Sequence, residues 1–173
     1  QDHADGLQGV YAQRFAPTGV KVGNEFRVNQ VTAYNQRSPA LAPLSDGRVV
    51  VVWVSEQQRF ERSVDVYARV YDANGVPASN EWLINTDTNV CASPTVAPSQ
   101  DGGSLVAWVQ KDLLNRSNSW DVMARPVSAA GVGGVTRRVN TTAYGDQLSP
   151  RVSANGSEDL VVWTSMGPAG SRE

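Results

Sequence analysis

Short apolar runs alternate with polar, turn-forming residues along this chain, and one such pattern occurs three times. Residues 44–54 read LSDGRVVVVWV, residues 99–109 read SQDGGSLVAWV, and residues 154–164 read ANGSEDLVVWT. In each case a turn signal containing Gly precedes an apolar run, which predicts the second strand of a β-hairpin. The tryptophans at positions 53, 108 and 163 are 55 residues apart, so the hairpin belongs to a repeated unit.

Other positions recur with nearly the same step and define the unit. Val-Tyr-Ala at 10–12 and 66–68, and Val-Met-Ala at 122–124, each precede a turn that ends in Gly. An Asn then follows at 29, 85 and 140, and Ser-Pro at 38–39, 93–94 and 149–150. We therefore divide the chain into a lead-in at 1–9 and three repeats at 10–64, 65–120 and 121–173, which form one domain or a portion of one.

Each repeat is expected to contain four short strands and essentially no helix. In the second repeat these strands are predicted at about 66–71, 81–85, 95–97 and 104–109. Apolar side chains alternate at Val66, Ala68 and Val70 with the period of two that a strand shows, and no segment keeps an apolar period of 3.6. Four antiparallel strands repeated at this length predict an all-β fold, a β-propeller built from three four-stranded antiparallel blades per chain.

The order of the strands predicts blades whose strands are split between the termini. With the Ser-Pro strand innermost, the N-terminal region supplies the outer pair of strands of one blade, and the C-terminal region supplies the inner pair of another. Three blades fall short of the usual four to eight. We therefore expect either a dimer that completes a six-bladed ring or a piece of a longer propeller with further repeats. Head-to-tail junctions that never close, and so build a fibre, are a third alternative.

The repeats resemble a known class of tandem repeats. The segments GVYAQRFAPTG and VGNEFRVN, DVYARVYDANG and NEWLIN, and SDGRVVVVWVS are similar to β-propeller-type repeats of large secreted and cell-surface, mostly bacterial, adhesin-like proteins. The resemblance covers all three repeats. It implies an extracellular, interaction-type role and brings no catalytic residues with it.

Composition and charge narrow the range of partners. The formal net charge is −2, which provides no basic face for nucleic acid. No apolar run approaches the roughly 20 residues that insertion across a membrane needs. The single cysteine, Cys91, excludes an intramolecular disulfide and a cysteine-based zinc site. Low charge, abundant Asn, Ser, Thr and Gly, and a chain that starts at Gln1 without an initiator Met favour a processed protein that is secreted or at the cell surface.

The sequence predicts a protein that is not an enzyme. The only histidine, His3, precedes the repeats, so a Ser-His-Asp or Cys-His apparatus would lack its general base. Paired carboxylates for glycoside hydrolysis are the alternative, but most acidic residues lie at turns or strand starts. The segment from Asp72 to Gly75 is either an approach to a calcium loop or a tight turn with Asn or Gly at positive φ. We expect no catalytic residue, no cofactor and no metal site.

Aromatic and polar residues on two loops form the predicted binding site. Trp53, Trp108 and Trp163 recur on apolar strands, which predicts core packing between blades. Trp120 does not recur and adjoins the longest loop, while the equivalent loop of the first repeat carries Phe60. A ring beside planar polar groups is a common arrangement for sugar binding. The predicted ligand-binding residues are Trp120, Asn115, Arg116, Asp112, Phe60 and Arg59.

A glutamine recurs just before Ser-Pro. Gln36 and Gln147 hold this place in the first and third repeats, and Cys91 holds it in the second. A recurring polar side chain at the start of a strand either bonds the backbone or contacts a ligand in the channel.

The leading functional hypothesis from the sequence is a secreted, non-enzymatic β-propeller repeat protein for extracellular recognition or adhesion, with a glycan as ligand. The alternative is a structural assembly or spacer module of an extracellular surface protein or fibre, without a small ligand.

Overall fold

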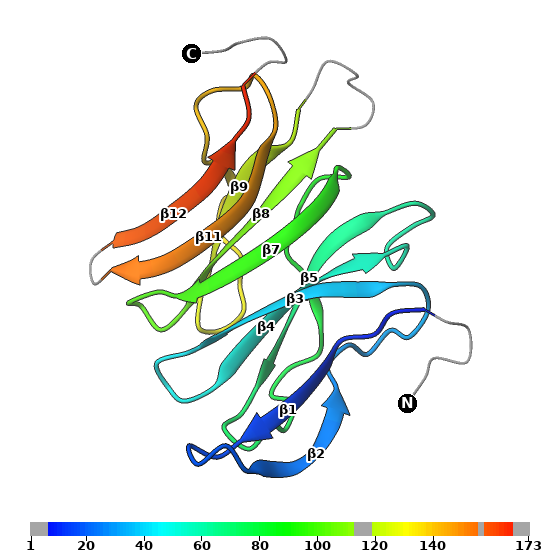
Figure 1. Ribbon diagram of the computed structural model, residues 1–173, viewed down its shortest axis with the longest axis vertical. Helices are drawn as coiled ribbons and strands as arrows, with labels where there is room; N and C mark the ends of the chain where they lie inside the picture. Colours follow the sequence, from blue (N-terminus) through cyan, green and yellow to red (C-terminus); the bar gives the residue numbers. More distant parts are fainter. Residues whose placement is uncertain (1–6, 113–118, 156–157, 168–173) are drawn as a thin grey trace.

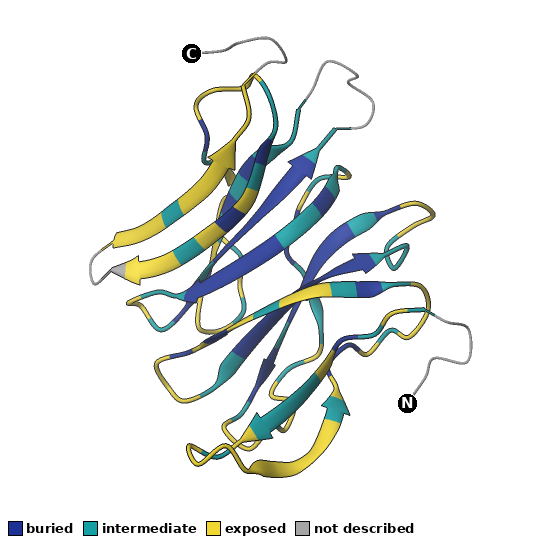
Figure 2. Cartoon of the chain, in the orientation of Figure 1, coloured by how far each residue is buried: buried dark blue, intermediate teal, exposed yellow. Residues whose placement is uncertain are grey.

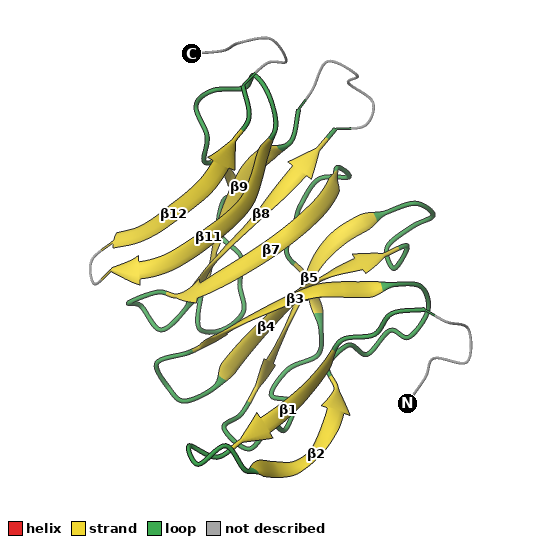
Figure 3. Cartoon of the chain, viewed as in Figure 1, coloured by secondary structure: helices red, strands yellow, loops and turns green. Residues whose placement is uncertain are grey.

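Twelve β-strands and their connecting turns make up the fold, and no helix occurs in the described residues (Figure 3). The computed structural model describes residues 7–112, 119–155 and 158–167. The strands are β1 (Tyr11–Phe15), β2 (Lys21–Arg27), β3 (Gln36–Pro43), β4 (Val49–Glu56), β5 (Val64–Tyr71), β6 (Trp82–Leu83), β7 (Val90–Pro98), β8 (Ser104–Lys111), β9 (Asp121–Val127), β10 (Arg137–Arg138), β11 (Gln147–Asn155) and β12 (Glu158–Ser165). Within these ranges nothing forms a helix that is long and apolar enough to cross a membrane.

The strands form four antiparallel sheets of unequal size (Figure 1). Two sheets have four strands, in the orders β3-β4-β5-β6 and β7-β8-β9-β10, and two have only two strands, β1-β2 and β11-β12. The prediction of an all-β chain with antiparallel sheets is confirmed. Each four-stranded sheet joins two strands of one repeat to two strands of the next.

The strands that contain Ser-Pro bring the sheets together. β3, β7 and β11 each lie at the edge of their own sheet, and the three sheets that contain them approach each other most closely through these strands. Figure 1 shows them side by side across the middle of the molecule. The remaining strands of each sheet follow outward in chain order.

Each Ser-Pro strand is interrupted by a β-bulge. Ser38, Ser93 and Ser149 have φ values of 54°, 48° and 52°, and the strand register shifts at each of these sites. A left-handed residue other than Gly is uncommon and costs on the order of 1 kcal/mol or more. The bulge accommodates the proline, which has no N–H to donate to a ladder.

One type of turn closes five of the hairpins. In the turn after β3, the Gly47 N–H bonds the Leu44 carbonyl at 3.1 Å, and the Leu44 N–H bonds the Arg48 carbonyl at 2.7 Å. The same two bonds recur in the turns after β1, β5, β7 and β9, each around a Gly with φ near 80°. Gly adopts this left-handed conformation without steric cost, which explains why every one of these turns ends in Gly.

One asparagine in each repeat ties the outer strand pair together. The Oδ1 atoms of Asn29, Asn85 and Asn140 accept the backbone N–H groups of Val10, Val66 and Val122 at 2.8–2.9 Å. Each Nδ2 donates to the carbonyl two residues further on, at Val31, Asp87 and Thr142. All three side chains are buried, so these bonds replace the ladder where the short outer strand ends.

Two hydrophobic clusters fill two of the spaces between neighbouring sheets. The cluster between the two four-stranded sheets contains Val52 and Trp108, and the cluster between β1-β2 and the next sheet contains Val28 and Trp53. Val52 and Trp53 are consecutive yet enter different clusters, because alternate residues of a strand face opposite sides. Trp53 and Trp108 are both 0% exposed, as predicted for core positions.

The prediction of a core position is wrong for the third tryptophan. Trp163 is 37% exposed, and its neighbours Leu160 and Val162 are 59% and 51% exposed. β12 lies at the edge of a two-stranded sheet, so among the described strands the outer strands that flank Trp53 and Trp108 have no counterpart beside Trp163. Figure 2 shows β12 as an almost continuous exposed strand, in contrast to β4 and β8.

Candidate functional site

The predicted ligand-binding residues lie on the loops that follow β4 and β8. These two strands hold the same position in their sheets and run in the same direction in Figure 1. Arg59 and Phe60 lie in the loop after β4, Asp112 at the end of β8, and Trp120 just before β9. Asn115 and Arg116 lie outside the described residues.

Arg59 is held by the fold through its guanidinium group. Its Nη2 donates to Asp65 Oδ1 at 2.6 Å and to the Asp87 carbonyl. Asp65 is 0% exposed, and the same carboxylate oxygen accepts a second bond from Asn85 Nδ2 at 2.8 Å. Removing one partner of a buried ion pair costs about 3–5 kcal/mol because the other charge is left without compensation. The described contacts of Arg59 therefore give it a structural role.

Phe60 is the exposed aromatic residue of this loop. Its side chain is 42% exposed, and the guanidinium carbon of Arg59 lies 5.0 Å from the centre of its ring. This is the distance range of a cation–π contact, which holds the ring in place while it faces solvent. The structure thus brings Arg59 and Phe60 together, with Phe60 as the accessible member.

Trp120 lies in the loop that leads into β9, away from the sheet of β4, and is half-buried. Its backbone N–H donates to Asp146 Oδ1 at 3.2 Å, and its carbonyl accepts the Gln147 N–H at 2.8 Å. These bonds fix the main chain where the loop returns to β9. Asp112 is also half-buried.

The recurring glutamines bond the tryptophans and the backbone. Gln36 Oε1 accepts the Trp53 Nε1–H at 3.1 Å, and Gln147 Oε1 accepts the Trp163 Nε1–H at 2.9 Å. Their amide groups donate to backbone carbonyls of the preceding loop. Both glutamines are 1% exposed, so the expectation of backbone bonding is confirmed for these side chains.

In the second repeat, the tryptophan indole N–H has its glutamine acceptor at a different position. Cys91 stands in place of the glutamine, and its sulfur is a weaker acceptor for the Trp108 indole than an amide oxygen. Gln110 stands where the other repeats have Ser55 and Ser165. Gln110 Oε1 accepts the Trp108 Nε1–H at 3.2 Å. Burial, with the nearby carboxylates of Asp87 and Asp65, raises the pKa of the Cys91 thiol, so it stays protonated and is a poor nucleophile.

The turn from Asp72 to Gly75 uses its carboxylate internally. Asp72 Oδ1 accepts the backbone N–H groups of Asn74 and Val76, both at 2.8 Å, and Gly75 has a φ of 77°. This is the geometry of the tight-turn alternative. Across the described ranges, no three acidic, cysteine or histidine side chains gather in a way that could hold a metal ion.

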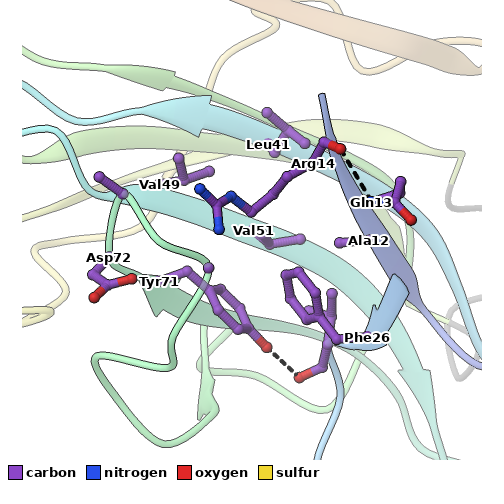
Figure 4. A pocket seen from close by; sticks show the side chains of 12 residues that line it. Ala12, Gln13, Arg14, Phe26, Leu41, Val49, Val51, Tyr71 and Asp72 are labelled. Carbon is purple, nitrogen blue, oxygen red and sulfur yellow. Dashed lines mark hydrogen bonds between the residues drawn. The ribbon is translucent and has the colours of Figure 1, made fainter. Parts of the chain in front are cut away.

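An apolar cavity lies between β1-β2 and the neighbouring sheet (Figure 4). Leu41 and Val49 lie along one side of it, and Phe26 and Tyr71 along the other. Burial raises the pKa of Tyr71, whose hydroxyl donates to the Val28 carbonyl at 2.8 Å. The cavity volume is about 200 Å³, which is below the roughly 300–1,000 Å³ of ordinary ligand pockets. Its size therefore fits a gap in packing between sheets better than a small-molecule site.

The exposed edge strand β12 is the surface that sequence reasoning missed. The three tryptophans are equivalent in sequence, but only Trp163 is on a two-stranded sheet. The predicted strand order could have revealed this surface, because from the third Ser-Pro onward the sequence predicts only two strands, the Ser-Pro strand and the tryptophan strand.

Comparison with known proteins gives no family assignment. The chain matches no protein-family model and no curated protein.

Proposed function

We propose that this chain is a non-enzymatic repeat module of β-propeller type from a secreted or cell-surface protein, and that its main task is assembly through its terminal sheets. The observation that carries the proposal is the exposure of Trp163, 37%, against 0% for Trp53 and Trp108 at the equivalent positions. β12 is an apolar strand that is exposed, whereas its equivalents in the other repeats are buried. Such a strand is best explained as a joint, meaning a surface at which another strand pairs.

Sheet order supports the propeller arrangement. Each complete blade would run outward from its Ser-Pro strand, from β3 to β6 and from β7 to β10. The Ser-Pro strands approach one another, as expected of the innermost strands around a central axis. β1-β2 would then be the outer half of one blade and β11-β12 the inner half of another.

Composition and resemblance support the extracellular, non-enzymatic character of the module. The chain has low charge and a single cysteine, and its repeats resemble those of adhesin-like surface proteins. Cys91 is buried with a raised pKa, and the one histidine precedes the repeats, so neither offers an obvious nucleophile or base.

The proposal is tested by supplying the outer half of the last sheet within one chain. A copy of residues 6–29 placed directly after Glu173 puts the copy of Val10 one repeat length after Val122. We expect the added strands to pair with β12, shift the tryptophan fluorescence to the blue, and raise the free energy of unfolding by several kcal/mol. This magnitude follows from about 1.5–3 kcal/mol for each large apolar side chain that becomes buried.

A matched control carries a proline at the copied Ala12. Proline in the middle of the added strand removes a ladder bond and clashes with the pairing, so the gain should disappear. Equal stability of the extended chain, the proline control and the original chain would contradict the proposal.

Carbohydrate recognition is a second candidate function, favoured by the exposed ring of Phe60 against Arg59. It predicts glycan binding in an array screen that Phe60→Ala or Trp120→Ala abolishes while the fold survives. Phe15→Ala is the matched control, since Phe15 is 59% exposed on β1, away from these loops. No glycan binding, or binding that survives both loop substitutions, would remove this function from consideration.

A further inference from the structure

We propose that β12 of one molecule pairs antiparallel with β1 of a second copy of this chain, so that the two half-sheets join into one four-stranded sheet. The inference rests on the proposed function and names the partner and the register. Among the described strands, β12 has β11 as its single neighbour and β1 has β2. Joined, they would give the order β11-β12-β1-β2, the same order as in the two complete sheets.

The complete sheets fix the register of this joint. In them Trp53 lies opposite Tyr67, and Trp108 lies opposite Met123. The equivalent pair at the joint is Trp163 of one copy and Tyr11 of the other, which are 37% and 38% exposed. The Trp53 and Tyr67 rings stack at a centroid distance of 6.5 Å, which shows what the joined pair would gain.

One position further along, the register also pairs small and apolar residues. Val52 lies opposite Ala68 in the first complete sheet, and both are 0% exposed. The equivalent pair at the joint is Val162 and Ala12. Val162 is 51% exposed, so pairing with a second copy would bring it toward the environment that Val52 already has.

The surface that would receive β12 is apolar and open on the first four-stranded sheet. Leu41 on β3 is 64% exposed, whereas Val96, its equivalent on β7, is 7% exposed. Val96 is covered because it packs in the cluster that contains Val50 and Val52 of the preceding sheet. Leu160 and Val162 are the equivalents of Val50 and Val52, so in a second copy they would cover Leu41 in the same way.

The apolar cavity beside Phe26 lacks cover on the same side. Between the two four-stranded sheets, the equivalent residues line a space of about 10 Å³ that Leu44 and Val50 of the preceding sheet close, and a second space of about 310 Å³ that Arg48 also lines. The cavity of about 200 Å³ beside Phe26 lacks such residues. Leu160 of a second copy is the equivalent of Val50 and would fill this space.

Charge favours a second copy of this chain as the occupant. β12 carries Glu158 and Asp159 and no basic residue, whereas β1 and β2 carry Arg14, Lys21 and Arg27 against the single acidic residue Glu25. The register places Asp159 opposite Phe15, whose β1-β2 partner is Lys21, and beside Arg14. Opposite charges would therefore meet at the tip of the joint, which guides pairing and opposes the reverse register.

Engineered cysteines test the register directly. A double variant Ala12→Cys and Val162→Cys places two thiols on residues that the joint would set directly opposite. Cβ atoms of such a pair are about 4.5–5.5 Å apart, so a small adjustment brings them to the 3.5–4.5 Å of a disulfide. Under mild oxidation we expect a product with the mass of two or more chains on a non-reducing gel, compared with 18.6 kDa for one chain. The original chain, with buried Cys91 alone, is the background control.

The control for register is Ala12→Cys with Leu160→Cys. These residues would share a face of the joined sheet but sit one pair apart, roughly 7–8 Å diagonally, which is too far for a disulfide. Crosslinking of the first pair and not the second supports the inference. No crosslink, or equal crosslinking of both pairs, overturns it. The two experiments separate the two proposals. If the chain extended by residues 6–29 is stabilised but the cysteine variants do not crosslink, the assembly function stands and the second copy is the wrong partner. If both experiments fail, both proposals fail.

Discussion

At the scale of single residues, the indole N–H of the repeated tryptophan bonds a glutamine that lies at one of two positions, depending on the repeat. Gln36 and Gln147 accept the indole proton in two repeats, and Gln110 accepts it in the repeat that has Cys91. Because the repeats share a backbone, Cys91 and Gln110 are a compensating pair: the glutamine missing at position 91 is supplied at position 110. An unpaired buried indole N–H would cost about 1–3 kcal/mol.

Gln110→Ser is therefore expected to lower the free energy of unfolding by about 1–3 kcal/mol, because it leaves the Trp108 indole with only the weakly accepting sulfur of Cys91. Adding Cys91→Gln should recover most of this loss, since the double variant has the residues of the other two repeats. Urea unfolding of both single variants and the double variant measures the coupling. Losses that simply add would show that a glutamine introduced at position 91 does not reach Trp108.

The thiol of Cys91 is expected to be unreactive in the folded protein. Burial raises its pKa, and the charges of Asp87 and Asp65 raise it further. The reactive thiolate is thus scarce at mildly alkaline pH, and modification by a thiol reagent should require unfolding. The check is the rate of labelling with and without urea; rapid, complete labelling of the native chain would contradict the buried position.

Glu56 is expected to make stability depend on pH in the acid range. Partial burial disfavours its charged form, but hydrogen bonds from Arg37 at 2.7 Å and Asn35 at 2.9 Å outweigh this and leave the pKa below its ordinary 4.5. A carboxyl group with a lowered pKa stabilises the fold above its ordinary value, and this contribution is lost as the pH falls through the folded value.

Glu56→Gln should therefore reduce the free energy of unfolding at neutral pH, and the difference from the original chain should shrink as the pH falls below 4.5. Glu61→Gln is the control, because Glu61 is 83% exposed and its ion pair with Arg62 is 3.8 Å long. A difference that stays constant down to the acid-unfolding range would contradict the assigned hydrogen bonds.

At the scale of elements, the period of two predicts most strands, and the deviations have local causes. The strand predicted at 66–71 is observed as Val64–Tyr71, but the one predicted at 95–97 is observed as Val90–Pro98. Pro94 suggests a break in the sequence, whereas a bulge at left-handed Ser93 lets the strand continue on both sides. The strand predicted at 81–85 shrinks to Trp82–Leu83 because the side chain of Asn85 takes over a bond to β5.

The bulge itself yields a prediction at Ser93, whose φ is 48°. Ser93→Val should destabilise the fold by about 1–3 kcal/mol, because a β-branched residue tolerates a left-handed conformation poorly. Ser93→Gly should be nearly neutral, since Gly adopts that conformation freely. Thermal unfolding of both variants provides the comparison, and equal losses would argue that side-chain contacts of Ser93 matter more than its backbone.

The candidate binding loops were only partly predictable from sequence. That Arg59 and Phe60 are neighbours is evident from the chain, but the bonds from Arg59 to Asp65 and Asp87 depend on a fold that brings separate loops together. Likewise, the sequence equivalence of Trp53, Trp108 and Trp163 carries no information on which of them is covered. Exposure depends on neighbouring sheets, and periodicity describes only the strand itself.

At the scale of the whole molecule, the proposed propeller arrangement would count the two complete sheets and the two half-sheets as three blades. A closed propeller has about four to eight blades, so a ring made only of copies of this stretch of chain would contain two of them. The proposal that a second copy completes the half-sheets therefore predicts a homodimer in which β12 of each copy meets β1 of the other.

The most direct test of this homodimer is the mass of the purified chain in solution, measured by native mass spectrometry over a range of concentrations. We predict a species at twice 18.6 kDa, without a ladder above it. A chain that remains at 18.6 kDa at every concentration would contradict completion by a second copy, and a ladder of larger multiples would contradict a closed ring.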